Sequence, residues 1–244
     1  MTSPSRSALI VEFSGIPGVG KSSVAHAVAA ALATTGQSVD EPLSFVSPAL
    51  ARSRRLLRKL RLASFEAVTH PLSSGTLAIA VARSGQSMGD FVHRVQNWLV
   101  VRALFRRSRR RSGVHLFDQG VVQELCSIGY RGDWRAALRS AAPGADDLAP
   151  DLIVRVTAPV EAVQQRLAAR AGAQSRLESL SHHEQEAALR RQAIELDEIE
   201  LAWLERFGGP RGSRRVEVDN GGPGTRVNVE QVLAEVLELL ARTR

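Results

Sequence analysis

A cluster of three glycines, one lysine and two serines occupies the segment GIPGVGKSS, residues 15–23, directly after an apolar run. Glycines let the backbone turn sharply and approach a ligand closely, so that successive N–H groups can converge on an anion. Lys21 adds a mobile positive charge, and the hydroxyl of Ser22 can bind Mg²⁺. The spacing G-x-x-x-x-G-K-S, ahead of the alanine-rich segment 23–36, predicts a phosphate-binding loop between a strand and a helix. The residues expected to hold a nucleotide are Gly15, Pro17, Gly18, Val19, Gly20, Lys21, Ser22 and Ser23.

The composition bounds the class of protein to which the chain can belong. Its 244 residues can bury a large core in one domain, and the single cysteine, Cys126, excludes an internal disulfide. No apolar run approaches the ~18 residues of a membrane-spanning helix. Glu12 interrupts the apolar run near the N-terminus that a signal peptide would need. We therefore expect a cytoplasmic protein without a membrane partner.

The net charge of +7 raises the question of a nucleic-acid partner. Much of the charge lies in two arginine-rich segments, residues 51–62 and 102–113, which would attract phosphate-bearing ligands or RNA if they formed one basic surface. Aromatic residues that could stack on bases do not alternate with these arginines. We therefore favour the interpretation that both segments are solvated helix faces, and nucleic acid is the less favoured partner.

Short apolar strands alternate with helical or loop segments along the chain. This order is typical of a parallel α/β sheet covered by helices on both faces, in which strands form continuous apolar runs. We expect one domain over residues 1–244, because neither a low-complexity linker nor an internal repeat divides the chain. The expected strands are residues 8–14, 37–41, 113–118, 151–158 and 214–219.

A long segment without strand character, residues 45–112, separates the second and third strands and is expected to form a helical insertion on the substrate side. It contains a helical stretch over 90–107. The segment 70–90 is rich in small and turn residues, which indicates either a hinge or substrate-cradling loop or a plain connection between helices.

Helix signals are clear toward the C-terminus. Ser181 and Glu184 form an S-x-x-E capping box that predicts a helix running to about Phe207, where two glycines and a proline follow. An amphipathic helix over 227–242 closes the chain.

Charged residues at the ends of strands are the candidates for chemistry. Asp118 ends the third strand and should lie beside the phosphate loop, where its carboxylate can bind Mg²⁺ through water, orient an acceptor, or simply cap the next helix. Arg166 and Arg170 share one face of the helix after the fourth strand, and Arg176 follows in a loop. These arginines either stabilise charge on a transferred phosphoryl group or are surface side chains.

Four segments, GIPGVGKSS, FDQG, the R-x-x-x-R helix and the terminal VEVDN, resemble in order and spacing the thymidylate kinase and deoxynucleoside kinase group of P-loop phosphotransferases. The resemblance covers nearly the whole chain. It implies a three-layer P-loop NTPase fold with strand order 2-3-1-4-5, ATP and Mg²⁺ as cofactors, and a lid over residues 166–182. The resemblance is also compatible with a homodimer.

Two further positions resemble that family. Glu41-Pro42 resembles the Glu-Pro whose carboxylate receives the proton of the acceptor hydroxyl in nucleoside kinases, which makes Glu41 an alternative base to Asp118. RVQN, residues 94–97, resembles the segment in which thymidylate kinases place an arginine and a glutamine for base recognition, so Arg94 and Gln96 would read the substrate. From the residues alone, Glu41 could equally be a turn residue at the end of a strand. Arg94 and Gln96 could equally lie on an exposed helix face.

The chain also departs from the family pattern. Thymidylate kinases carry Asp-Arg after the third strand, but Gln119 follows Asp118 here and cannot form an ionic clamp on an acceptor phosphate. Pro17 stands nearest the acidic residue that reads the deoxyribose, and the lid segment at 175–178 lacks an aspartate. These departures indicate that dTMP itself is not the substrate.

The motifs together predict an ATP- and Mg²⁺-dependent kinase acting on a small acceptor, which Glu41, Arg94, Gln96 and Gln119 would contact. The acceptor is either a nucleoside monophosphate or a hydroxyl compound such as a nucleoside, sugar or natural product. By the family resemblance, the segment 219–226 would lie where such kinases rest the donor base, but its glycines could equally form a plain turn. A different class, a nucleotide-driven switch acting with RNA or a protein partner, would not require the arginine-bearing lid.

Overall fold

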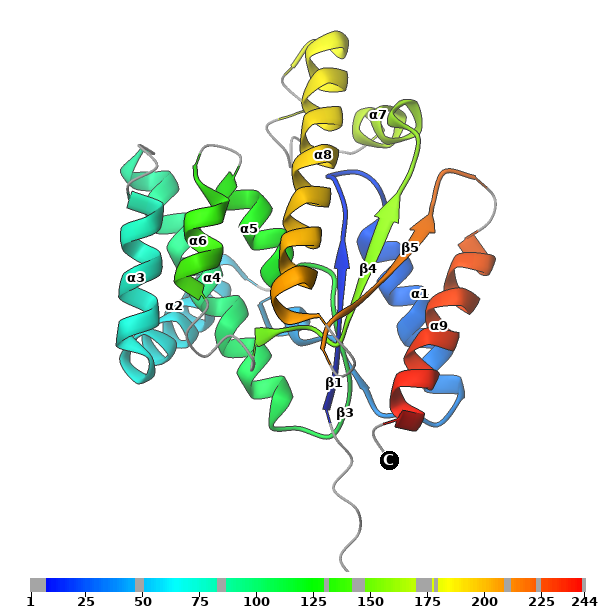
Figure 1. Ribbon diagram of the computed structural model, residues 1–244, viewed down its shortest axis with the longest axis horizontal. Helices are drawn as coiled ribbons and strands as arrows, with labels where there is room; N and C mark the ends of the chain where they lie inside the picture. The colour runs from blue at the N-terminus through cyan, green and yellow to red at the C-terminus, as the bar shows by residue number, and fades with distance from the viewer. Residues whose placement is uncertain are drawn as a thin grey trace, which may run out of the picture.

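The computed structural model describes residues 8–46, 51–82, 87–129, 132–141, 148–169, 177, 180–208, 212–222 and 225–242. Five parallel strands form one sheet in the order β2-β3-β1-β4-β5, which confirms the predicted topology (Figure 1). β2 is shorter than predicted and contains only two residues. The strands are β1 (Ala8–Ser14), β2 (Val39–Asp40), β3 (Gly113–Phe117), β4 (Leu152–Thr157) and β5 (Arg214–Asp219).

Helices cover both faces of the sheet, as the apolar runs of the strands predict. On one face lie α1 (Lys21–Thr34) and α9 (Thr225–Arg242), which pack on each other. On the other face lie α4 (Met88–Arg109), α5 (Val121–Gly129) and α8 (His182–Phe207). The remaining helices are η1 (Pro42–Val46), α2 (Arg52–Thr69), α3 (Pro71–Ala82), α6 (Trp134–Ala141) and α7 (Val160–Ala168).

The strand β1 directs alternate side chains to two different environments. Leu9, Val11 and Phe13 join the apolar core under α1 and α9. Ile10 points to the opposite core, and Glu12 and Ser14 must follow it because side chains two apart share a face. Polar side chains are thereby buried under α5 and α8, close to the carboxyl edge of the sheet.

The capping box at the start of α8 is confirmed. The Ser181 side chain accepts a hydrogen bond from the backbone N–H of Glu184, and the Glu184 carboxylate accepts one from the backbone N–H of Ser181 at 3.0 Å. The helix ends at Phe207, and Gly208 caps it, as the sequence predicts. At the C-terminus, α9 begins at Thr225, two residues before the predicted start.

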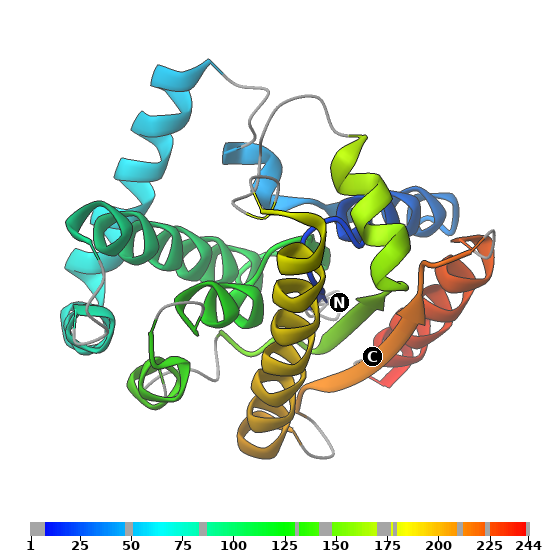
Figure 2. The same cartoon turned by 90° about the horizontal axis from the view of Figure 1, so that it is seen from above.

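The helical insertion differs from its prediction at residues 71–82. This part of the segment expected to be a hinge, a loop or a plain connection is the helix α3. Pro71 occupies its first position, where the missing N–H costs nothing, and the apolar residues Leu77 and Val81 are buried on one side. Figures 1 and 2 show α2, α3, α4 and α6 together, on the side of the molecule away from α1 and α9.

The arginine-rich segment 102–113 is not a fully solvated helix face, contrary to the sequence-based interpretation. Arg102 and Arg106 are buried and both pair with Glu66 of α2, with Arg102 Nε and Arg106 Nη1 each 3.1 Å from Glu66 Oε1. Arg102 Nη2 also donates to Ser73 Oγ of α3 at 2.7 Å. These arginines hold α2 and α3 against α4, because a buried charge must be paired.

Within the parts of the chain that the structure describes, no helix combines the length and apolar character needed to cross a membrane.

Candidate active site

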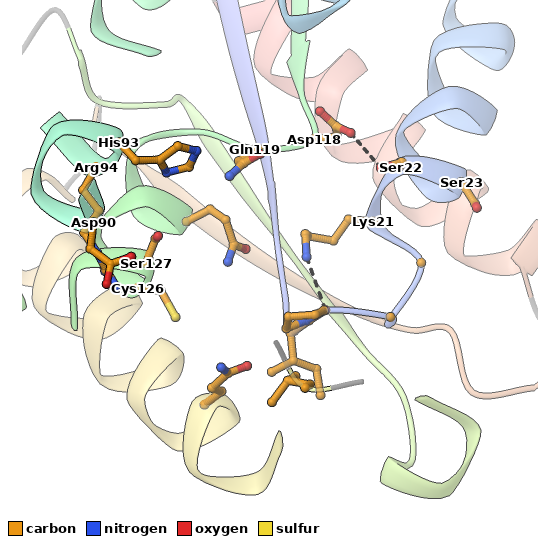
Figure 3. A pocket seen from close by; sticks show the side chains of 17 residues that line it. Lys21, Ser22, Ser23, Asp90, His93, Arg94, Asp118, Gln119, Cys126 and Ser127 are labelled. Carbon is orange, nitrogen blue, oxygen red and sulfur yellow. Dashed lines mark hydrogen bonds between the residues drawn. The ribbon is translucent and has the colours of Figure 1, made fainter. Parts of the chain in front are cut away.

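A cavity of about 570 Å³ opens at the carboxyl edge of the sheet, where ligands bind in open α/β folds. The segment after β1 forms one side of it, and α4, α5 and α8 form the other (Figure 3). Its volume lies within the range of about 300 to 1,000 Å³ that is usual for small-molecule sites. The lining residues are Ile16, Pro17, Gly18, Gly20, Lys21, Ser22, Ser23, Asp90, His93, Arg94, Asp118, Gln119, Gln123, Cys126, Ser127, Leu177 and Gln192.

The segment 15–20 joins β1 directly to the N-terminus of α1, as the phosphate-loop pattern predicts. Gly18 and Gly20 have φ angles of 85° and 99°, a left-handed conformation that side chains rarely adopt. A Cβ atom at Gly20 would also lie 2.3 Å from Asn220 Nδ2. Both glycines are therefore required for the loop shape, which leaves the N-terminus of α1 at the cavity, a place suited to binding an anion.

Lys21 lies across this loop. Its Nζ donates hydrogen bonds to the carbonyl oxygens of Gly15 and Ile16 at 2.7 and 3.3 Å. Figure 3 shows the amine inside the cavity, between the loop and the side chains of α4 and α5. A mobile ammonium group in this place can exchange its carbonyl partners for phosphate oxygens.

Ser22 and Asp118 meet at the start of α1. Ser22 Oγ donates to Asp118 Oδ2 at 2.7 Å, and Asp118 follows β3, the strand beside β1 (Figure 3). A hydroxyl and a carboxylate are the oxygen ligands that suit Mg²⁺, which usually keeps several waters and binds substrate phosphates. Among the described residues no group of three or more His, Cys, Asp or Glu side chains could hold a metal ion.

Glu41 does not line the cavity. It follows β2 and pairs with His26 Nδ1 at 2.6 Å. Since His26 lies one helical turn after Ser22, the carboxylate is near the site but is directed to α1. Of the two candidate bases, Asp118 is the one in the cavity.

Arg166 contacts the phosphate loop from outside. Its Nη1 donates to the carbonyl oxygen of Val19 at 3.0 Å and its Nη2 to that of Asn220 at 2.5 Å. The guanidinium group thereby joins α7 to the loop and to the end of β5. Arg170 and Arg176 lie outside the described residues, as does most of the lid segment. Leu177, from that segment, is buried and lines the cavity.

The far end of the cavity is lined by polar side chains of α4 and α5. Asp90, His93 and Arg94 come from α4, and Arg94 is only 6% exposed. Figure 3 shows them on the side opposite Ser22. Gln96 does not line this cavity, because two residues along a helix turn a side chain about 200° away.

Gln119 has a fixed partner at this end. Its Nε2 donates to Glu124 Oε1 at 3.0 Å, and Glu124 is buried behind it. Burial raises the pKa of Glu124 to about 7, although the charges of Lys59 and Arg94 oppose this shift. The amide of Gln119 is therefore oriented, and its Oε1 is the atom that can accept a hydrogen bond from a ligand.

Sequence reasoning missed several lining residues: Asp90, His93, Gln123, Cys126, Ser127, Leu177 and Gln192. For α4 a signal existed, since Asp90, His93 and Arg94 share one helix face at spacings of three and four. For α5 and α8 no local motif marks the positions that face the cavity.

Two buried glutamates support the site from behind. Burial raises the pKa of Glu12 to about 8, and its Oε1 accepts a hydrogen bond from the backbone N–H of Gln123 at 3.0 Å. Glu200 of α8 accepts hydrogen bonds from Ser14 Oγ and from Arg155 Nη1, the latter at 3.1 Å. These contacts join the end of β1 to α5 and α8, the helices that carry part of the cavity wall.

Comparison with protein-family models finds no match to the sequence, and comparison with curated proteins finds none either. Solved structures do match the fold. A deoxyadenosine kinase from M. mycoides with bound dATP aligns over 94% of this chain and 100% of its own, with 12% identity and a TM-score of 0.50. A shikimate kinase from Acinetobacter baumannii in complex with shikimate aligns over 96% and 95%, with 14% identity and a TM-score of 0.47.

At such low identity the likeness concerns architecture alone. The parallel sheet in the order 2-3-1-4-5, the glycine loop between β1 and α1, and the alignment over nearly the whole deoxyadenosine kinase chain agree with one another. The protein has the fold of the P-loop kinases.

Proposed function

We propose that the protein is an ATP- and Mg²⁺-dependent phosphotransferase that moves the γ-phosphoryl group of ATP to a small acceptor. One observation carries the proposal: the phosphate loop and the Ser22–Asp118 pair open into a cavity that continues to a polar end between α4 and α5. A nucleotide held at the loop would meet a second ligand in the same enclosed space.

At the donor end, the backbone N–H groups of the loop and Lys21 would hold the β and γ phosphates. Ser22 and Asp118 would hold Mg²⁺, which neutralises phosphate charge when bound. The preference for ATP rests on the family resemblance and on the nucleotide in the deoxyadenosine kinase structure. A cytoplasmic location, where ATP is available, is part of the same proposal.

The transfer forms a bond between the acceptor oxygen and the γ phosphorus and breaks the bond to the bridging oxygen of ADP. The acceptor hydroxyl loses its proton to a carboxylate, for which Asp118 and Glu41 are the candidates. We favour Asp118, because it lines the cavity and Glu41 is paired with His26. Arg166 would hold the loop in shape, and Arg170 and Arg176 remain proposals for closing over the transferred group.

On the acceptor side, Arg94 and Gln119 line the cavity and would contact the acceptor, and Gln96 remains a proposal from the family resemblance alone. The lid over 166–182 and the division into one domain with a helical insertion are likewise proposals. A homodimer is a further proposal, supported by exposed apolar side chains such as Phe65 and Val68 of α2 and Leu72 of α3.

The test is an acceptor-dependent phosphorylation assay. The full chain is incubated with ATP, Mg²⁺ and pools of nucleosides, nucleoside monophosphates, sugars and amino alcohols, and ADP release and product mass are measured. A phosphorylated product in one pool supports the proposal. ATP hydrolysis that only RNA or a protein partner stimulates, with no phosphorylated product, overturns it in favour of a nucleotide switch.

Lys21→Ala is the control for the chemistry. Removing a charge aimed at the transferring group should lower kcat about 10²- to 10³-fold. Thermal unfolding of the variant, measured alongside, separates a loss of chemistry from a loss of folding. Activity that survives this change would come from a contaminating kinase or from another site.

A further inference from the structure

We infer that the acceptor is a neutral polyhydroxylated compound, such as a monosaccharide or a cyclitol, and not a nucleoside or a nucleoside monophosphate. The inference rests on the proposed function and concerns the polar end of the same cavity. Three properties of that end carry it: the kinds of side chain that are missing among the described lining residues, the kinds that are present, and their charges.

No Phe, Tyr or Trp side chain is among the described residues that line the cavity, and the planar groups there are the exposed ring of His93 and the almost fully buried guanidinium of Arg94. Proteins hold a nucleobase through its flat face, by stacking it on aromatic rings or on arginine. The large rings of the helices around the site are instead buried in the apolar core, as for Trp98, Phe105 and Trp203. The apolar surface that remains in the cavity comes from small or aliphatic side chains: Ile16, Pro17, Cys126 and Leu177.

Hydrogen-bonding side chains dominate the polar end. Gln119 contributes an amide and Ser127 a hydroxyl, and Gln123 and Gln192 add two further amides to the cavity wall. An amide presents two donors and an acceptor, and a hydroxyl presents both kinds, so together they match the mixed pattern of sugar hydroxyls. Gln123 is oriented as well, because its Oε1 accepts a weak hydrogen bond from the Gly15 N–H at 3.3 Å.

The charges at this end do not favour a phosphate group. Gln119 is neutral and oriented by Glu124, so it offers an acceptor atom where a phosphate would need a cation. Arg94 is the cation that lines this end, but Glu124 faces it from α5 and Asp90 lines the same end. Lys59 of α2 also faces Glu124, and Lys21 lies at the donor end. Asp90 and Glu124 therefore offset much of the positive charge of Arg94 and Lys59 at this end.

The experiment compares acceptor classes one compound at a time, with the full chain, ATP and Mg²⁺, and measures product mass and kcat/KM. A monosaccharide or cyclitol that gains one phosphoryl group, with kcat/KM at least about 100-fold above any nucleoside or nucleoside monophosphate, supports the inference. A nucleoside or nucleoside monophosphate as the best acceptor overturns it and leaves the proposed phosphotransferase intact. No phosphorylated acceptor, with hydrolysis stimulated only by RNA or protein, overturns both.

Two variants locate the acceptor in the cavity. Ser127→Ala and Arg94→Gln should each raise the KM of the acceptor about tenfold, because each removes a hydrogen-bonding partner, while the KM of ATP stays unchanged. The matched controls are Ser64→Ala on the exposed side of α2 and Arg139→Gln on the exposed side of α6. An acceptor KM that neither cavity variant changes, in proteins with unaltered thermal unfolding, would overturn the assignment of this end.

Discussion

The donor end and the acceptor end of the cavity are built by different means. The donor end is one continuous segment, residues 15–23, whose shape follows from glycines and from the helix that starts at Lys21. The acceptor end combines side chains of α4, α5 and α8 with the end of β3. Buried ion pairs join α4 to α2 and α8 to β4, and the Glu12 carboxylate of β1 accepts a hydrogen bond from α5. On the proposed function, a local motif thus makes a general phosphate site, and long-range packing makes the part that selects the acceptor.

Replacing the candidate bases should produce the largest effect and would test the donor end. Asp118→Asn should lower kcat about 10²- to 10⁴-fold, since a positioned base contributes that much. Glu41→Gln should have a much smaller effect, because Glu41 pairs with His26 outside the cavity. Steady-state kinetics with varied Mg²⁺ checks this. The opposite order of effects would make Glu41 the base.

Breaking the ion pairs of Glu66 would test how the acceptor end is held. Glu66→Ala leaves Arg102 and Arg106 buried without their carboxylate, and we expect a loss of about 3 to 5 kcal/mol in the free energy of unfolding. Urea unfolding measures it. The control Glu198→Gln removes an exposed partner of Arg135 and should change stability by less than about 1 kcal/mol. If Glu66→Ala lowered the free energy of unfolding by less than the control does, the proposed structural role of the Glu66 ion pairs would be contradicted.

Glu12 lies between the two ends and should make stability depend on pH. Its pKa is raised from 4.5 to about 8 by burial, so the folded state binds more protons than the unfolded state between these values. Stability should therefore be highest near the lower value and fall by at most about 1.4 kcal/mol per pH unit up to pH 8.

The variant Glu12→Gln should flatten this dependence, because an amide keeps the hydrogen bond from the Gln123 N–H without titrating. Thermal unfolding from pH 5 to pH 8 shows the difference. Glu124, with its pKa raised to about 7, keeps part of the slope in the variant. If stability changed with pH by the same amount in the variant and in the unaltered protein, Glu12 would not titrate as described.

Removing the cap of α8 should have the smallest effect. Ser181→Ala deletes the side chain that accepts from the Glu184 N–H, and we expect a loss of about 1 kcal/mol in stability. Glycine at the same position should cost only a few tenths, which provides the matched comparison. Equal losses for alanine and glycine would argue against a capping role.

The sequence determined the donor end and the frame around it. The glycines, Lys21 and Ser22 act through backbone conformation and helix polarity, which depend on neighbours within a few residues. Four of the five strands and the capping box of α8 were likewise predicted within a residue or so, since they depend on local apolar runs and local hydrogen bonds. The strand order came from resemblance to a family.

Only the tertiary structure decided the rest. The burial of Arg102 and Arg106 could not be predicted, because their partner Glu66 lies some 40 residues away on another helix. The helix α3 was missed, because its small residues carry a weak pattern and it is stabilised by packing. The rotation of α4, which brings Arg94 into the cavity and leaves Gln96 outside, also follows from packing. Side chains that meet across separate elements are positioned by the whole core, and no short segment of sequence contains that information.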